Sequence, residues 1–232
     1  MIRGVVFDLD HTLFDRYGTL RKVLPIFYSH YRSNIPEDLS EDVFIERFIL
    51  LEKKYIHFGW LKMLQCCVED GILVAVAENA YGEIAHFILH SCWTADAVPY
   101  PFAEPALQKL REMGYKVAII TNGSHDVQAR KIQMLGLEPL TDEIIITGDI
   151  GVHKPNALPF DLMSQRLGIP SQELMYVGDH PKNDVEGSRN AGYTPVWVKT
   201  TGYWCFEDIP RAAYEVETVA EIPALVASIN GK

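Results

Sequence analysis

Short apolar runs alternate with amphipathic, helix-like segments through most of this sequence. Five runs have the length and composition of buried strands, at residues 5–7, 117–120, 144–147, 175–177 and 195–198. Helical patterns at residues 105–113, 126–135, 157–167 and 184–191 each stop at a glycine, a common helix terminator, and a last helix is expected at residues 223–229. Strands that alternate with helices form βαβ units, so the sequence predicts an α/β fold with a doubly wound, mostly parallel sheet.

Residues 16–98 break this alternation. Apolar and aromatic residues recur at helical spacing between Tyr17 and Tyr31, and Ser40 is placed to cap a second helix whose inward residues are Phe44, Ile45, Phe48 and Tyr55. Residues 72–89 support at least one more helix. Because a structureless stretch of about 80 residues is improbable in a compact domain, we expect a small helical domain at residues 16–98, inserted into an α/β domain of residues 1–15 and 99–232.

Charge and hydropathy exclude several classes of protein. The formal net charge is −10, and an acidic surface argues against nucleic-acid binding. No apolar run reaches the roughly 20 residues of a membrane span, and none at the start resembles a signal peptide, so we expect a cytoplasmic protein. The cysteines form no CxxC pair, which speaks against zinc and redox sites, and we expect buried or half-buried apolar roles for Cys66, Cys67, Cys92 and Cys205.

Acidic residues follow two of the predicted strands directly. Asp8 and Asp10 come after the first strand and, being two residues apart at a strand end, point to the same side. Asp179 follows the strand at residues 175–177, and Asp184 lies near the start of the next helix, where it also suits the helix dipole. Because open α/β sheets place their sites at the carboxyl ends of strands, we expect these four acids to converge.

Two further segments offer groups that suit a phosphate. Thr121-Asn122-Gly123 follows a strand with a hydroxyl and freely oriented amides, although the same residues also form ordinary turns. Lys154 lies in a loop stiffened by Pro155, although a single lysine is more often a solvated surface charge. Two carboxylates ~4 Å apart repel by roughly 4 kcal/mol at an effective dielectric near 20, so the acids need a cation, and all-oxygen ligands favour Mg²⁺.

Taken together, the four segments resemble the motifs of the haloacid dehalogenase (HAD) superfamily of hydrolases, in order and in context. The insert at residues 16–98 resembles the helical cap of one subtype. The resemblance implies a Rossmann-like core and a Mg²⁺-dependent phosphatase that works through an aspartyl-phosphate. Its expected substrate is a small phosphorylated metabolite, from the class of sugar phosphates, phosphoglycolate and nucleoside monophosphates.

The resemblance also implies roles for the acids. Asp8 is similar to the family's nucleophile, and Asp10 to the acid/base that protonates the leaving oxygen and then activates water. Asp8, the backbone carbonyl of Asp10 and Asp179 are similar to the magnesium ligands. Asp184 is similar to a residue that binds the ion through water or supports its ligands.

The remaining motif residues resemble the phosphate-binding set, which would consist of Thr121, Asn122 and Lys154. His11 departs from the family, which more often has glycine there. This histidine either touches substrate or only fills space near the hinge, and we favour the second interpretation.

Other functions use similar residues. A phosphomutase of the same family would share them all and differ in the cap, so the sequence does not separate it from a phosphatase. A 2-haloacid dehalogenase needs neither a metal nor Asp10, which disfavours it. A receiver-like signalling domain is about half as long and carries its phosphorylated aspartate after a later strand, while a degenerate binding module would lack a motif residue. We expect no nucleic-acid or membrane partner, and the sequence does not predict the oligomeric state.

Overall fold

The computed structural model describes residues 1–74, 80–88, 97–200, 204 and 206–231. The chain divides into two compact units, one made of Met1–Asp15 with Pro99–Lys232 and the other of Arg16–Val98. Where the chain leaves and re-enters the first unit, Phe14 forms an antiparallel bridge with Pro99, and the Tyr100 N–H donates to the Leu13 carbonyl at 3.1 Å. None of the described helices combines the length and hydropathy needed to cross a membrane.

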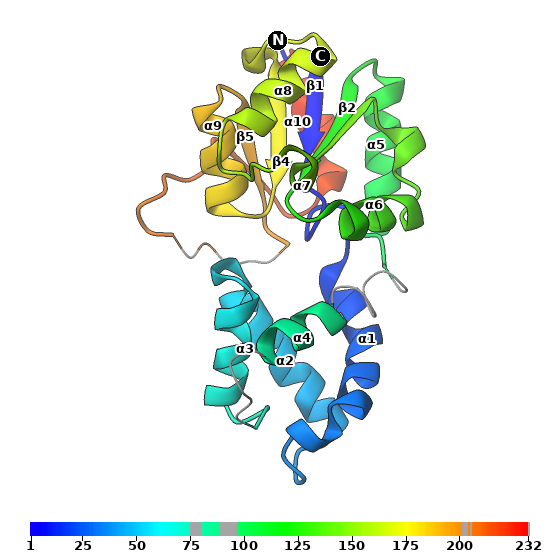
Figure 1. Cartoon of the computed structure of the whole chain (residues 1–232). Coiled ribbons are helices and arrows are strands. Elements are labelled where there is room, and N and C mark those ends of the chain that lie inside the picture. The colour runs from blue at the N-terminus through cyan, green and yellow to red at the C-terminus, as the bar shows by residue number, and fades with distance from the viewer. Residues whose placement is uncertain (75–79, 89–96, 201–203, 205, 232) are drawn as a thin grey trace. The chain divides into compact units, whose positions relative to one another are not determined.

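A six-stranded sheet forms the centre of the first unit (Figure 1), in the order β3-β2-β1-β4-β5-β6. All of its strand pairings are parallel, which confirms the predicted doubly wound α/β fold. The strands are β1 (Gly4–Phe7), β2 (Lys116–Thr121), β3 (Glu143–Ile146), β4 (Leu174–Gly178), β5 (Thr194–Val198) and β6 (Tyr214–Val216).

Two differences from the predicted strands have simple causes. Strand β6 was not predicted, because its three residues have the charged Glu215 at their centre and form no apolar run. Thr147 was predicted to end a strand but instead begins the short helix α7 (Thr147–Ile150). Neither difference affects β1 and β4, the two central strands, which pair with each other.

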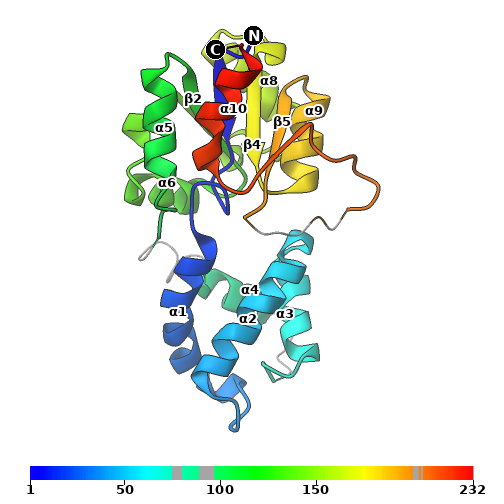
Figure 2. The ribbon, with the colours of Figure 1, turned by 180° about the vertical axis from the view of Figure 1, so that it is seen from behind.

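Helices cover both faces of the sheet. α5 (Ala103–Glu112) and α10 (Ile222–Ile229) lie on one face (Figure 2), and α8 (Leu158–Leu167) and α9 (Gly187–Asn190) on the other (Figure 1). Phe160 and Met163 of α8 pack in one cluster with Val6 and Tyr176. Because successive strand residues face opposite sides, burial on both faces makes β1 apolar throughout, which is why its sequence reads as a continuous apolar run.

The remaining helices of this unit follow the carboxyl ends of strands. α6 (His125–Met134) follows β2. After β4, the predicted helix at residues 184–191 instead begins as a π-helix, η6 (Pro181–Glu186), and continues as α9. The His180 imidazole caps that start, since its Nδ1 accepts the N–H groups of Lys182 at 3.1 Å and Asn183 at 3.2 Å. Short 3₁₀ turns lie at Arg32–Asn34, Ile56–Phe58, Glu138–Leu140, Ser171–Glu173 and Val219–Glu221.

The second unit is helical throughout its described secondary structure. Its helices are α1 (Arg16–His30), α2 (Glu41–Tyr55), α3 (Trp60–Glu69) and α4 (Ala80–His86). Phe27 of α1 and Phe44 of α2 stack with ring centroids 5.8 Å apart, in a core that also contains Phe48. The aromatic stripes of the sequence are therefore the core of this unit.

Some local predictions for this unit need correction. Ser40 occupies the N-cap position of α2, but its side chain makes no capping hydrogen bond. α3 was not predicted, since it begins after Gly59 without a capping side chain. Of the helix expected at residues 72–89, only Ala80–His86 form α4. Residues 72–74 are not helical, and residues 75–79 and 89 lie outside the described residues. Cys66 and Cys67 are buried, as expected, while Cys92 and Cys205 fall outside the described residues.

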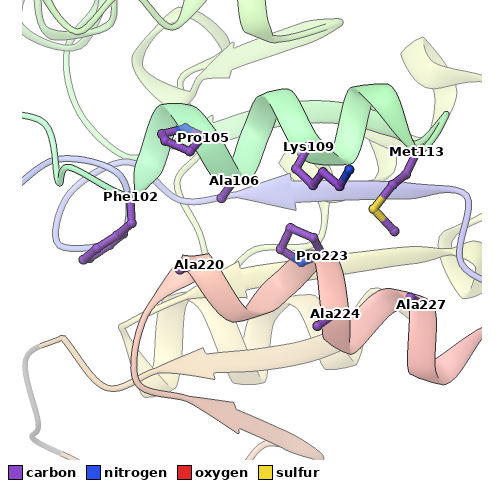
Figure 3. A pocket seen from close by; sticks show the side chains of 9 residues that line it. All are labelled: Phe102, Pro105, Ala106, Lys109, Met113, Ala220, Pro223, Ala224 and Ala227. Atoms are coloured by element: carbon purple, nitrogen blue, oxygen red, sulfur yellow. The ribbon is translucent and has the colours of Figure 1, made fainter.

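An apolar groove of about 460 Å³ runs between α5 and α10. Figure 3 shows side chains of the two helices facing each other across it, with Lys109 and Met113 at one end and Phe102 at the other. No candidate catalytic residue lines the groove.

Candidate active site at the carboxyl edge

The chain turns sharply just after β1, and this turn places Asp8. The Asp8 N–H donates to the Val177 carbonyl at 2.9 Å, which extends the pairing of β1 with β4 by one residue. The Leu9 carbonyl then accepts the N–H groups of both Leu13 and Phe14 at 2.9 Å, which closes the loop. His11 in this loop has φ of +61°, a left-handed conformation that a residue other than glycine rarely adopts. Its side chain is buried, and its carbonyl accepts the Thr200 hydroxyl.

The end of β4 brings two more acids to the same edge. Gly178 is required there, because a Cβ at this position would lie 2.5 Å from Cγ of Asp184. The Asp184 Oδ2 accepts the His180 N–H at 2.9 Å, so the start of η6 holds this carboxylate in place. The Asp179 carbonyl accepts the Trp197 indole N–H at 2.7 Å, which fixes the backbone next to it.

Three buried carboxylates meet between these two loops. Asp8, Asp179 and Asp184 each offer an oxygen within 4.8 Å of the others. Asp179 Oδ2 is buried and has no hydrogen-bond partner among the described residues. A buried acceptor without a partner is uncommon in a native protein, and this one belongs to a cluster of three acids. The cluster is therefore a candidate metal site.

Lys154 supplies the positive charge next to this cluster. Its Nζ donates to Asp8 Oδ1, Asp184 Oδ1 and the Tyr176 hydroxyl, each at 2.7 Å. An ammonium has three protons to donate, so these contacts use all of them. Tyr176 in turn donates to the Ile120 carbonyl at 3.0 Å, so strands β2 and β4 both contribute to the placement of Lys154.

The loop that carries Lys154 is held by Asn122. The Asn122 amide donates to the Lys154 carbonyl at 3.0 Å, and its Oδ1 accepts the Lys154 N–H at 2.9 Å. The peptide bond between Lys154 and Pro155 is cis. The side-chain amide of Asn122 is therefore committed to the backbone of Lys154.

Burial and mutual repulsion shift the ionisation of these groups. Burial raises the pKa of Asp8 to about 7; Lys154 opposes the shift, and the carboxylates of Asp184 and Asp10 add to it. Burial and the carboxylates of Asp184, Asp8 and Asp10 raise the pKa of Asp179 well above its ordinary value, and Lys154 opposes this shift. Burial acts to lower the pKa of Lys154, but the carboxylates of Asp184 and Asp8 outweigh it and raise that pKa. Lys154 therefore stays charged, while the carboxylates resist being ionised together.

Asp10 lies beside this cluster, with its carboxylate held by helix α6. Lys131 Nζ donates to Asp10 Oδ1 at 2.7 Å, and Gln128 Nε2 donates to Asp10 Oδ2 at 3.0 Å. The same Gln128 amide donates to the hydroxyl of Thr121, the last residue of β2. Asp10 and Thr121 are thus joined through one side chain.

The structure brings the predicted site residues together in two groups. The first group is the cluster of Asp8, Asp179 and Asp184, with Lys154 bonded to Asp8 and Asp184 and Asn122 bonded to the Lys154 backbone. The second is Asp10 and Thr121, which share Gln128. Sequence reasoning missed Gln128, Lys131 and Tyr176. The one signal that points to the first two is their spacing of three residues in the helix that follows the Thr121 motif.

The sequence matches the profile of the family described as haloacid dehalogenase-like hydrolase over residues 5–198. It is 30% identical to a glyceraldehyde 3-phosphate phosphatase of Methanopyrus kandleri, over 99% of each chain. It is 26% identical to the N-acylneuraminate-9-phosphatase of Homo sapiens, over 100% of this chain and 96% of that protein. Among solved structures, the protein YfnB from Bacillus subtilis has the same fold, with a TM-score of 0.76 at 18% identity over 97% of this chain and 98% of that one.

Proposed function

Because this chain belongs to the haloacid dehalogenase-like hydrolase family, we propose that it is a Mg²⁺-dependent phosphatase of small phosphorylated metabolites, with Asp8 as its nucleophile. The observation that carries the proposal is the buried cluster of Asp8, Asp179 and Asp184, hydrogen-bonded through two of its members to Lys154. A carboxylate nucleophile beside a fixed cation suits the attack on an anionic ester. The cytoplasmic location stays a prediction.

The residues at this edge fit a hard divalent cation. Their donors are all oxygen atoms, which Mg²⁺ prefers, and the buried Asp179 Oδ2 lacks a hydrogen-bond partner among the described residues. We assign Asp8, Asp179 and the backbone carbonyl of Asp10 as ligands, with Asp184 in support. When bound, Mg²⁺ would offset the repulsion between the carboxylates and supply positive charge next to the phosphoryl group.

In the first step, Asp8 attacks phosphorus and the bond from phosphorus to the ester oxygen breaks, which leaves an aspartyl-phosphate. Asp10 gives its proton to the departing oxygen, so an alcohol leaves. Lys154 Nζ, 2.7 Å from Asp8 Oδ1, places its positive charge next to the phosphoryl oxygens, where negative charge develops. The Thr121 hydroxyl and the Asn122 backbone N–H complete the binding of those oxygens.

In the second step, Asp10 takes a proton from water, and the water oxygen bonds to phosphorus. The bond between phosphorus and Asp8 breaks, so inorganic phosphate leaves and the Asp8 carboxylate is restored. One difficult hydrolysis thereby becomes two in-line displacements, in which Asp10 acts first as acid and then as base.

The similar phosphatases indicate which esters to expect. Their names specify glyceraldehyde 3-phosphate and N-acylneuraminate 9-phosphate, and in both molecules the phosphoryl group esterifies a terminal carbon of a hydroxylated chain. Within the class of sugar phosphates, phosphoglycolate and nucleoside monophosphates, we therefore favour sugar phosphates esterified at a terminal carbon. We assign substrate selection, and exclusion of water from the first step, to the helical unit Arg16–Val98 acting as a cap.

A phosphate-release screen tests the proposal. The purified chain is incubated with Mg²⁺ and a panel of phosphorylated metabolites, with EDTA and with the Asp8→Asn variant as controls. Release of inorganic phosphate that requires both Mg²⁺ and Asp8 supports the phosphatase. Phosphoryl transfer that needs a bisphosphate activator would favour the phosphomutase, and halide release from 2-haloacids without metal would favour the dehalogenase; either result without phosphate release refutes the proposal.

A further inference from the structure

Two buried side chains of α6 hold the carboxylate of Asp10 at both of its oxygens. Lys131 Nζ lies 2.7 Å from Oδ1, and Gln128 Nε2 lies 3.0 Å from Oδ2. Lys131 is 1% exposed and Gln128 is 2% exposed, whereas the Asp10 side chain keeps 22% of its surface open. Asp10 is therefore held by two buried donors while part of its side chain remains exposed.

The fold delivers both groups from a single turn of helix. Residues three apart lie on the same face of an α-helix, so Gln128 and Lys131 point the same way. The Gln128 amide uses its two protons on Asp10 and on the Thr121 hydroxyl, which fixes its own orientation. Gly123 lies against this side chain, since a Cβ there would be 2.9 Å from Gln128 Cγ.

Lys131 is not explained by packing alone. A buried ammonium loses its hydration, and an apolar side chain of the same length would fill this position without that loss. The ammonium is instead compensated by Asp10 and by the ring of Phe14, whose centroid lies 4.9 Å from Nζ. Phe14 belongs to the loop after β1 that also carries Asp10, so these two contacts come from the same loop.

We propose that Lys131 and Gln128 are positioning residues that orient the carboxylate of Asp10 for its proton transfers. This inference rests on the proposed function, in which Asp10 exchanges protons with the leaving oxygen and then with water. Anchoring Oδ1 and Oδ2 restricts rotation of the carboxylate, so the remaining lone pairs point along fixed directions. A displacement of about 1 Å in a catalytic group lowers rates by about 10²-fold, so loss of the anchor affects catalysis rather than substrate binding.

Lys131→Met tests this in the full chain with Mg²⁺, because methionine fills similar space without the charge. On a sugar phosphate, whose alcohol must be protonated, kcat should fall about 10- to 100-fold with KM changed less than about threefold. The first-turnover release of p-nitrophenolate, which leaves without a proton, should change less than about threefold. Lys131→Arg should restore most of kcat, and Arg130→Met, at an exposed position of the same helix, should match the wild type.

Several outcomes would overturn the inference. Wild-type kcat in Lys131→Met refutes it, and so does an equal loss on both substrates or a loss that appears only in KM. If circular dichroism shows that Lys131→Met is unfolded, Gln128→Met decides in its place, with the same expected split between the two substrates. If the wild-type chain releases no phosphate, the proposed function has failed. If Asp10→Ala impairs turnover of the sugar phosphate but Lys131→Met and Gln128→Met do not, only this inference has failed.

Discussion

Removal of the Asp179 charge should stabilise the metal-free protein while abolishing its response to Mg²⁺. The oxygens of Asp8, Asp179 and Asp184 lie within 4.8 Å of one another, which at an effective dielectric near 20 gives a repulsion of at least about 3 kcal/mol for each ionised pair. Lys154 hydrogen-bonds Asp8 and Asp184 and offsets part of this repulsion. We therefore expect Asp179→Asn to raise the free energy of unfolding in EDTA at pH 8 by about 2 kcal/mol, or Tm by roughly 4–8 °C.

The stability gained by Asp179→Asn should be larger at high pH than at low pH. The pKa of Asp179 is raised in the folded state, so its contribution to stability is present at low pH and is lost as pH rises through the folded pKa. The pKa of Asp8 is about 7, so at pH 5 the cluster takes up protons and the repulsion is relieved. The difference between Asp179→Asn and the wild type should therefore shrink from pH 8 to pH 5.

Thermal unfolding with EDTA or with Mg²⁺ measures both effects. Mg²⁺ at 100 times its Kd should stabilise the wild type by about 2.7 kcal/mol and so raise its Tm. The Tm of Asp179→Asn should not respond to Mg²⁺. Asp208→Asn removes the same charge at an exposed position of the same unit and should change neither quantity. A variant that is less stable than the wild type in EDTA at pH 8, and still responds to Mg²⁺, would show that these carboxylates neither repel one another nor bind the ion.

Three other substitutions probe the same edge. Gly178→Ala should lower stability by about 1–3 kcal/mol and weaken the Mg²⁺ response, because its Cβ would lie 2.5 Å from Asp184. Denaturant unfolding measures the loss of stability, and the change of Tm with Mg²⁺ measures the weakened response. Lys154→Met leaves the buried carboxylates of Asp8 and Asp184 without their cation and should cost about 3–5 kcal/mol, and an unchanged unfolding midpoint would contradict the ion pairs. Asp8→Asn should keep the circular dichroism spectrum and reduce phosphate release to background, whereas substantial turnover would exclude the covalent route.

The sheet could be predicted from sequence because its strands are buried on both faces. β1, β2, β4 and β5 are apolar nearly throughout, so each reads as a short apolar run bounded by loops. β6 pairs only with β5, and its three residues carry a charge, so no such run marks it.

The acids of the site could be predicted for a related reason. Asp8 and Asp179 follow adjacent parallel strands, whose ends must lie at the same edge, and this geometry brings together residues far apart in the chain. Lys154 hydrogen-bonds Asp8 across 146 residues of sequence. The sequence marked this lysine by its loop, stiffened by Pro155, and the family resemblance placed it in the phosphate-binding set.

The hydrogen bonds of individual side chains could not be predicted from the periodicity of the sequence. Lys131 lies in a helix where lysine is normally solvent-exposed, and nothing in the pattern around it marks this one as buried. Tyr176 reads as an apolar strand residue, although its hydroxyl hydrogen-bonds Lys154. Asn122 was predicted to bind phosphate, and only the coordinates show its amide committed to the Lys154 backbone.

The helical insert begins and ends at neighbouring points of the α/β unit, where Phe14 pairs with Pro99 and Tyr100 hydrogen-bonds Leu13. A segment inserted between two neighbouring backbone positions does not require the strands to move apart. Its length has only a weak effect on the entropy cost of bringing its two ends together. The helical insert can therefore change in length or be replaced during evolution while the register of β1 against β2 and β4 is preserved.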